Sequence, residues 1–190
     1  LGAALGAVNT ILLYPKVMSK AEYGVITIMT SIALLVSSLS SFGANTSIIK
    51  YLPKYRIEKE KSNQGLLSYV LLIAGLFSLL SIAILVIFKD SILGPFENSA
   101  DLLVTYYYFI IPLFLANLLL EVFSNYANGL LKTTLQLFLK EVFLRFSQSV
   151  LIVLYYFEII DLTNFLVLYV LVYFISFSIL FSYLSYLKEI

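Results

Sequence analysis

The chain has 190 residues, of which 61% are hydrophobic and only 12% are charged. Soluble domains carry about 25% charged residues, so this chain has about half of the usual means of covering itself with a polar surface. Its outer surface must be largely apolar, which indicates a lipid environment. The net charge of +1 gives no general attraction to nucleic acid. The sequence has no cysteine and no histidine, which excludes disulfides, thiol chemistry and the commonest general base.

Apolar runs without charge predict membrane-spanning helices. The run Leu1 to Leu13 is too short to cross a bilayer and lacks the initiator methionine and basic region of a signal peptide, so we interpret it as the end of a truncated helix. Residues 66–88 would rise about 34 Å as a helix, which is enough to cross a hydrocarbon core of about 30 Å. The expected full spans are 23–42, 66–88, 102–125, 136–157 and 162–184. The sequence therefore predicts an all-α membrane bundle of about six helices in one domain, residues 1–190, as a fragment of a longer protein.

A short polar stretch separates the first two apolar runs. Pro15 disfavours helix at Tyr14 and is expected to end the first helix there. Ser19 and Glu22 have the spacing of a capping box, in which each side chain bonds the backbone amide of the other residue. The pattern predicts a tight turn and a capped restart, as a helical hairpin needs at a membrane surface.

Basic and acidic connections alternate along the chain, and this alternation predicts the orientation of the protein in the membrane. The connection 50–64 contains Lys50, Lys54, Arg56, Lys59 and Lys61. The connection 89–101 is acidic through Asp90, Glu97 and Asp101. By the positive-inside rule, both chain ends and the 50–64 connection are expected in the cytoplasm and the 89–101 connection outside. Lys16 and Lys20 oppose this assignment, because they would lie outside.

Charged residues inside apolar spans are costly and mark function by default. Arg145 lies well inside the fifth span, and Glu121 lies in the later part of the fourth. Arg145 has three open interpretations: pairing with Glu141 one turn earlier, neutralisation by Glu121 across a helix interface, or contact with a ligand. Lys140 is nearer the end of its span and is interpreted as an anchor that reaches the interface, or as a second cation for a ligand.

Two further residue types have a structural and a functional interpretation. Asn125 and Asn128 follow Glu121 and are expected either to bond helices together or to present amides to a sugar. Tyrosines gather near the span ends, where their rings are expected to anchor the protein at headgroup depth or to line an inner surface. These tyrosines are Tyr51, Tyr55, Tyr106, Tyr107, Tyr108, Tyr155, Tyr156, Tyr183 and Tyr186.

Several enzyme chemistries lack their residues in this sequence. The carboxylates are scattered, so no paired acids are available to hold Mg²⁺ against a diphosphate. There is no glycine-rich phosphate loop and no H-E-x-x-H helix, and a serine nucleophile would have no histidine. We therefore expect no enzyme activity, no catalytic residue, no cofactor and no metal ion.

Three stretches carry a resemblance to a known family. They are the short turn that ends in "EYG", the small-residue-rich second helix that runs into "FGANTSIIKYLPKYR", and the fifth helix "LFLKEVFLRFSQSVLIVLYY". Together they resemble the bacterial polysaccharide flippases, the O-antigen and capsule exporters of the multidrug/oligosaccharidyl-lipid/polysaccharide superfamily. The resemblance covers nearly all of the chain and rests on pattern and spacing.

The resemblance implies a transporter of the bacterial inner membrane that exports polyprenyl-diphosphate-linked oligosaccharide by alternating access. Two six-helix bundles would face each other across a cationic cavity, and this chain would be most of the first bundle, with membrane lipids and a missing C-terminal bundle of the same chain as its partners. Arg145 and Lys140 match the basic positions, and the candidate substrate-binding set also includes Glu121, Asn125 and Asn128. Two alternatives stay open: a cation-coupled multidrug exporter of the same superfamily, and a non-transporting membrane subunit of a glycan-synthesis complex.

Overall fold

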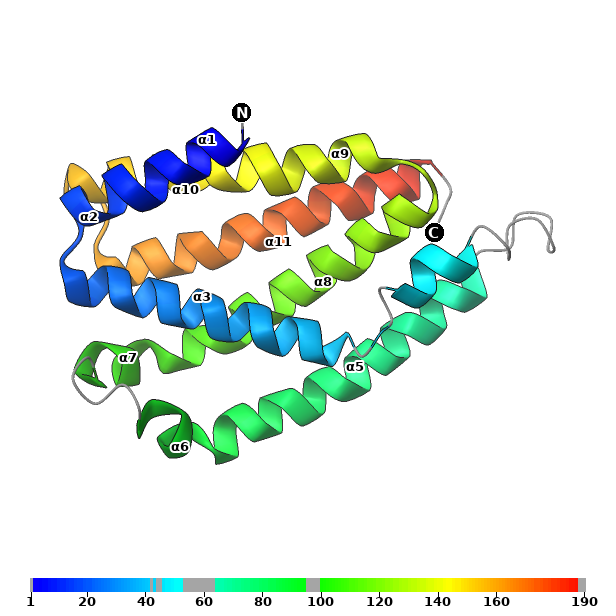
Figure 1. Cartoon of the computed structure of the whole chain (residues 1–190), viewed down its shortest axis with the longest axis horizontal. Helices are drawn as coiled ribbons and strands as arrows, with labels where there is room; N and C mark the ends of the chain where they lie inside the picture. The colour runs from blue at the N-terminus through cyan, green and yellow to red at the C-terminus, as the bar shows by residue number, and fades with distance from the viewer. Residues whose placement is uncertain (1, 42, 44–45, 53–63, 95–99, 188–190) are drawn as a thin grey trace.

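The computed structural model of the protein describes residues 2–41, 43, 46–52, 64–94 and 100–187 (Figure 1). Within these ranges the chain forms helices and no strand, which confirms the expected all-α fold. Four helices are long and apolar enough to span a membrane: Lys20–Ser40, Gly65–Ile87, Asp101–Gly129 and Leu162–Tyr186. The protein is therefore a helical bundle of the membrane type.

The first helical segment runs past Pro15, so the prediction that it ends there is wrong. It consists of α1 (Gly2–Ala7), a π-helical stretch η1 (Val8–Leu13) and α2 (Tyr14–Val17). The backbone N–H of Tyr14 bonds the carbonyl of Asn9, five residues earlier, and this opens the turn just before the proline. Proline lacks an N–H donor, and its ring needs room beside the preceding turn of the helix. The widened π turn provides that room, so the helix continues to Val17.

The capping box at the start of α3 (Lys20–Ser40) is confirmed. The Glu22 amide donates to Ser19 Oγ over 3.3 Å, and the Ser19 amide donates to Glu22 Oε2 over 2.8 Å. The second carboxylate oxygen of Glu22 accepts a hydrogen bond of 2.7 Å from the Tyr155 hydroxyl, near the end of α10 (Leu144–Tyr156). The capped turn is thereby tied to a helix far along the chain.

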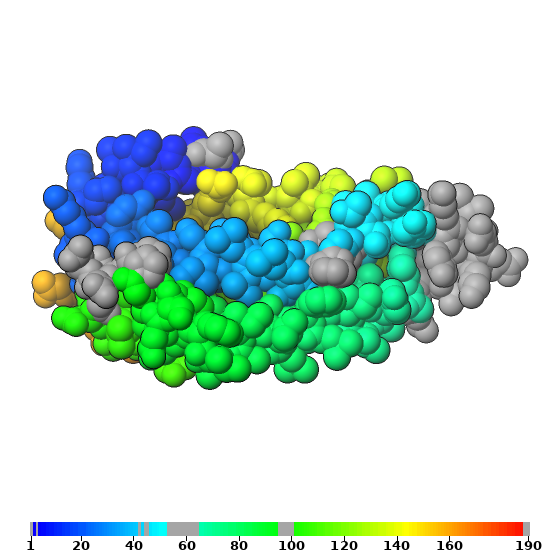
Figure 2. All heavy atoms as spheres, turned by 60° about the horizontal axis from the view of Figure 1, so that its bottom comes forward, coloured from blue at the N-terminus to red at the C-terminus, as the bar shows by residue number. Residues whose placement is uncertain are grey.

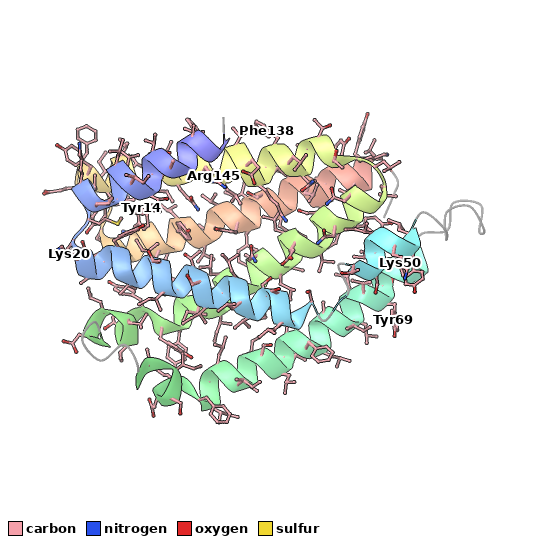
Figure 3. The ribbon with its side chains drawn as sticks, in the orientation of Figure 1. Tyr14, Lys20, Lys50, Tyr69, Phe138 and Arg145 are labelled. Atoms are coloured by element: carbon pink, nitrogen blue, oxygen red, sulfur yellow. The ribbon has the colours of Figure 1, made fainter. Side chains whose placement is uncertain are left out.

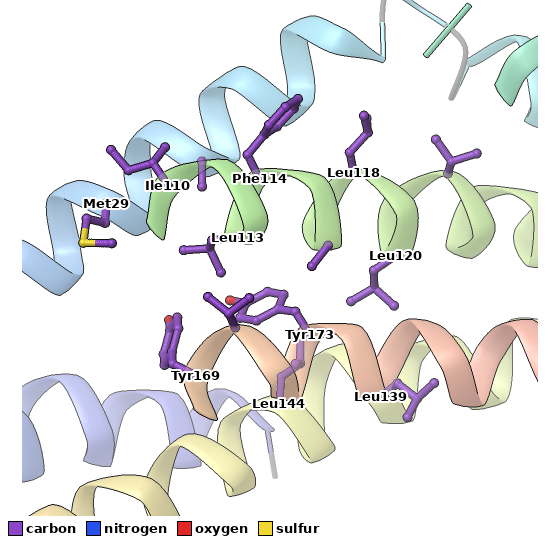
Figure 4. Packing of buried hydrophobic residues seen from close by; sticks show 14 of the residues in the cluster. Met29, Ile110, Leu113, Phe114, Leu118, Leu120, Leu139, Leu144, Tyr169 and Tyr173 are labelled. Atoms are coloured by element: carbon purple, nitrogen blue, oxygen red, sulfur yellow. The ribbon is translucent and has the colours of Figure 1, made fainter. Parts of the chain in front are cut away.

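The centre of the bundle is the helical path through α7 (Ala100–Tyr106), η3 (Tyr107–Phe109) and α8 (Ile110–Gly129). α8 packs between α3 and α11 (Leu162–Tyr186), and buried apolar side chains fill both contacts (Figure 4). The early segment α1–α2 lies alongside α10 and meets α3 at its end (Figure 1).

One long helix lies along the outside of the bundle. α5 (Gln64–Ile87) buries a narrow stripe of small and apolar side chains, which are Leu67, Val70, Ala74, Ser78 and Leu85. Its outer face exposes leucines by about 60%, namely Leu72, Leu76, Leu79 and Leu80. In Figure 2 it forms a continuous strip along one side of the molecule. An apolar face of this length fits contact with lipid.

The fifth expected span, 136–157, is helical from Thr133 to Tyr156 but is divided. α9 (Thr133–Phe138) leads into a π-helical turn η4 (Leu139–Phe143) and then into α10. The Leu144 amide bonds the carbonyl of Leu139, five residues earlier. The segment is not among the four long apolar helices, and its charged residues Lys140, Glu141 and Arg145 lie in the π turn or just after it.

Alternate connections of the chain gather at the same end of the bundle (Figure 1). The end of α3, the start of α5, the α8–α9 connection and the end of α11 lie together at the end that carries Lys50 and Lys132. The opposite end carries most of the described acids, which are Glu22, Asp90, Asp101, Glu158 and Asp161. The alternation of helix directions that the charge pattern requires is therefore present. Most of the predicted cytoplasmic and external connections, residues 53–63 and 95–99, lie outside the described residues.

The tyrosines near the span ends divide into two groups. Tyr156 and Tyr186 are exposed by 63% and 84%, as expected for interfacial anchors. Tyr107 is fully buried instead, and its hydroxyl donates to the carbonyl of Leu85 over 2.7 Å. Its neighbours in sequence point elsewhere because successive residues of a helix face different directions. Tyr55 lies outside the described residues.

Candidate functional site

Two adjoining hollows run along the inner side of the bundle, and we refer to them together as the polar groove. The first has a volume of about 440 Å³ and lies between η1, α3, α10 and α11. The second, of about 350 Å³, lies between α3, α8, η4 and α11. The hollows adjoin because they share four lining residues, which are Leu34, Lys140, Leu144 and Tyr173. Both hollows are partly open, and the described helices do not enclose them completely.

Arg145 lines the first hollow and is held from two sides. Its Nη2 lies 3.2 Å from Glu141 Oε2, with 36% of the arginine side chain and 52% of the glutamate side chain exposed. On the other side its guanidinium lies against Gly6, where a Cβ atom would overlap Nη1. Figure 3 shows Arg145 beside α1, on the same hollow as Tyr14. One carboxylate occupies only part of the five-donor guanidinium, so Arg145 can also bind an anion in the groove.

The backbone around Arg145 is fixed by the π turn of the first helix. Asn9 Nδ2 donates to the carbonyl of Arg145 over 2.9 Å, and Asn9 Oδ1 accepts from the Ser149 hydroxyl over 2.7 Å. Asn9 is only 2% exposed, so these bonds lie in a protected position. π turns recur at functional sites, and here two of them, η1 and η4, lie beside the same arginine.

Lys140 lies in η4 and lines both hollows. Its position is within the groove and not at a free helix end, although the sequence alone favoured an interfacial anchor. Glu121 lines only the second hollow, with Ser38 and Asn117, and its Oε2 accepts a 3.2 Å hydrogen bond from Ser37. The structure therefore groups Glu121 with Lys140 and groups Glu141 with Arg145.

The two asparagines of the predicted set do not line the groove. Asn125 Nδ2 donates to the carbonyl of Glu121 on its own helix over 3.0 Å. Asn128 Oδ1 accepts from Gln136 Nε2 over 2.8 Å and so joins α8 to α9. Their geometry agrees with a structural role, the first of the two interpretations that the sequence left open.

Neutral polar groups at one end of the first hollow were not foreseen from the sequence. The Tyr169 hydroxyl accepts from Gln148 Nε2 over 3.1 Å and lies 3.4 Å from Thr30 Oγ1. These residues come from α10, α3 and α11, so no local spacing links them. The available signal was that Gln148 and Thr30 are polar side chains inside apolar spans, where polar groups face the interior.

A third hollow, of about 730 Å³, is larger than either part of the polar groove but lies at the acidic end of the bundle and is a weaker candidate for an anion site. It is lined by Glu22, Glu158 and Asp161 and by one cation, Lys16. Two of these acids already have structural partners, because Glu22 belongs to the capping box and Asp161 caps α11. An excess of carboxylates repels phosphate, so the cationic polar groove is the better site for such a ligand.

Comparison with family models, with characterised proteins and with solved structures finds no match to this chain. The class of protein is therefore defined by the structure itself, as a helical membrane protein with a polar groove along its interior. The groove contains two cations, a carboxylate and a cluster of neutral hydrogen-bonding groups.

Proposed function

We propose that this chain is the first helical bundle of a bacterial inner-membrane flippase that exports polyprenyl-diphosphate-linked oligosaccharide, as in O-antigen or capsule synthesis. The observation that supports the proposal is the position of Arg145 and Lys140. Both line one groove inside a bundle whose outer surface is apolar. Cations inside a membrane bundle are costly, and an anionic ligand offsets that cost.

A diphosphate headgroup explains why such a groove is needed. The headgroup is too polar to cross a hydrocarbon core unaided, because desolvating an ion costs far more than burying an apolar group. Arg145 binds phosphate oxygens with a planar pair of N–H donors, and Lys140 adds a compact charge. The polyprenyl chain remains in lipid beside the open side of the groove. A second bundle would close that side, and rocking of the two bundles would expose the headgroup to each face of the membrane in turn.

The two alternatives fit the groove less well. A cation-coupled drug exporter needs a carboxylate that is available to a cation, but Glu121 accepts from Ser37 and lies beside Lys140. An organic cation in that hollow would meet a positive charge. A non-transporting subunit gives no reason for a partly exposed arginine inside a polar groove. Such a subunit would tolerate exchange of Arg145, and this difference supplies the test.

The test measures surface polysaccharide in a bacterial strain that lacks its own flippase and produces the full-length protein. Arg145→Ala should lower export by about tenfold or more at equal membrane abundance, because a charge-assisted hydrogen bond is worth about 1.5–3 kcal/mol. Arg145→Lys should give an intermediate value, since it keeps the charge but loses the planar pair of donors.

The matched control is Glu141→Gln, which removes the protein partner of Arg145 and leaves the arginine. If Arg145 serves the ligand, Glu141→Gln should retain most of the export. Equal loss of export and of protein abundance in both variants would mean that the ion pair only supports folding. Normal export with Arg145→Ala at wild-type abundance would contradict the proposed function.

A further inference from the structure

The first hollow of the polar groove has two chemically different ends. Arg145 and Lys140 form a cationic end, while Thr30, Gln148 and Tyr169 form a neutral end. Along the helical path, Gln148 follows Lys140 by eight residues, about 12 Å of rise, and follows Arg145 by three residues, about 4.5 Å, so the two ends adjoin at Arg145. The neutral end lies toward the turn between α2 and α3, because α3 begins there and Thr30 precedes Leu34 along it.

The neutral end is organised around the Tyr169 hydroxyl. Thr30 Oγ1 donates its proton to the carbonyl of Ile26 over 2.7 Å, so in its 3.4 Å contact with Tyr169 the tyrosine is the donor. The same tyrosine oxygen accepts from Gln148 Nε2 over 3.1 Å. Tyr169 is 5% exposed, whereas Gln148 and Thr30 are partly exposed on the hollow. The result is an ordered set of amide and hydroxyl groups with their orientations fixed in advance.

We propose that this neutral end holds the sugar unit next to the diphosphate, with Gln148 and Tyr169 as the residues that determine the preference for a sugar. The inference rests on the proposed function and adds the sugar-binding position and the orientation of the ligand. The diphosphate lies at Arg145 and Lys140, and the sugar points toward the α2–α3 turn.

The chemistry of the neutral end favours a sugar over the other parts of the ligand. A hydrocarbon chain would leave the amide and hydroxyl groups without solvent, which costs free energy for each polar group that loses water. A phosphate would find its cations at the other end of the hollow. A neutral sugar supplies hydroxyl groups that both donate and accept, and these match an amide and a phenol that also do both.

The experiment compares two probes that differ only in the sugar: undecaprenyl diphosphate, and the same carrier with one N-acetylglucosamine. Dissociation constants are measured for the full-length protein in lipid nanodiscs. The wild-type protein should bind the sugar-bearing carrier about tenfold more tightly, the effect of one or two net hydrogen bonds. Gln148→Met and Tyr169→Phe keep the side-chain size and should reduce this preference to about twofold or less. Neither variant should change the affinity for the bare carrier by more than about twofold.

Matched controls remove the same groups away from the groove. Gln136→Met loses the bond to Asn128, and Tyr107→Phe loses the bond to the carbonyl of Leu85. Both should retain the wild-type preference for the sugar. If Tyr169→Phe does not fold, Gln148→Met decides the outcome alone, because its side chain is partly exposed on the hollow.

The outcomes separate this inference from the proposed function. Equal affinity of the wild-type protein for both probes, or full preference in both groove variants, would overturn the sugar position and leave the flippase proposal standing. Equal weakening of both probes by the groove variants would also overturn it, since the residues would then only shape the hollow. Failure of the wild-type protein to bind either probe would reject the proposed function itself.

Discussion

Two glycines of the first helix determine how closely it approaches the charged segment. A Cβ atom at Gly6 would overlap Nη1 of Arg145, which is the flexible end of a side chain. A Cβ atom at Gly2 would overlap the backbone carbonyl of Glu141, which cannot move without moving η4. These glycines stand four residues apart, the small-xxx-small spacing that lets membrane helices pack closely. Gly2 therefore allows a close contact with the backbone of Glu141, and Gly6 leaves room for the side chain of Arg145.

The two positions predict opposite effects of the same substitution. Gly6→Ala should leave membrane abundance near the wild-type value but lower export several-fold, because Arg145 shifts out of its place. Gly2→Ala should lower stability by about 1–3 kcal/mol, as overpacking against backbone does. Unfolding titrations in mixed micelles and surface polysaccharide give the two readouts. Gly24→Ala is the control, because nothing lies within 4 Å of a Cβ there; it should affect neither readout adversely. Reduced abundance of Gly6→Ala with normal export per molecule would refute the positioning of Arg145 by Gly6.

At the scale of the helix, the start of α3 shows how a local signal and a tertiary contact share one side chain. One oxygen of Glu22 closes the capping box, and the other accepts from Tyr155. The turn that joins the first two long helical segments is thus fixed to the end of α10. Loss of the cap should loosen this end of the bundle without altering the groove.

Ser19→Ala is expected to lower the free energy of unfolding by about 1 kcal/mol, since it removes an N-cap hydrogen bond. Tyr155→Phe should have a similar effect by releasing Glu22 from α10, about 1 kcal/mol for one hydrogen bond. Thermal or denaturant unfolding in micelles measures both. Thr27→Val is a suitable comparison, because its hydroxyl bonds only the carbonyl of Tyr23 on its own exposed turn. Unchanged stability of Ser19→Ala would show that the end of α3 is held by other contacts.

At the scale of the whole molecule, the two ends of the bundle differ in charge and therefore in the side of the membrane that they face. The end with Lys50 and Lys132 should face the cytoplasm, and the end with Asp90, Asp101 and Asp161 should face outward. Lys16, Lys20 and Lys89 also lie at the acidic end, where Glu22 and Asp90 offset part of their charge. The orientation is expected from the acids that gather at one end and from the basic sequence of the 50–64 connection between α3 and α5.

Single cysteines test this orientation, because the chain contains none of its own. Ser91 and Thr134 are exposed at opposite ends of the bundle. In cells with a permeabilised outer membrane, an impermeant thiol reagent should label Ser91→Cys and leave Thr134→Cys unlabelled. Disruption of the inner membrane should then make Thr134→Cys reactive. The reverse labelling pattern would place the basic end outside and would reverse the direction of the groove relative to the membrane.

The amino-acid sequence by itself determined the features that depend on local spacing. Apolar runs such as 66–88 identified spanning helices because a hydrocarbon core excludes unpaired backbone groups and rewards about 20 apolar residues in sequence. Ser19 and Glu22 predicted their own capping box, and Glu141 and Arg145, one turn apart, formed one of the contacts that the sequence left open for Arg145. In each case the partners lie within four residues of each other, so helix geometry alone brings them together.

Only the tertiary structure decided which side chains share the polar groove. Asn9 contacts the carbonyl of a residue 136 positions later, and Thr30 meets Tyr169 across 139 positions. No local period encodes such contacts. The tertiary structure also decided that the first helix continues through Pro15 and that Tyr107 is buried. Neighbouring helices, and not local propensity, set the free-energy cost of a widened turn and of a buried hydroxyl. Helix formation in this protein follows from the lipid-compatible sequence, whereas the chemistry of its interior follows from packing between distant segments.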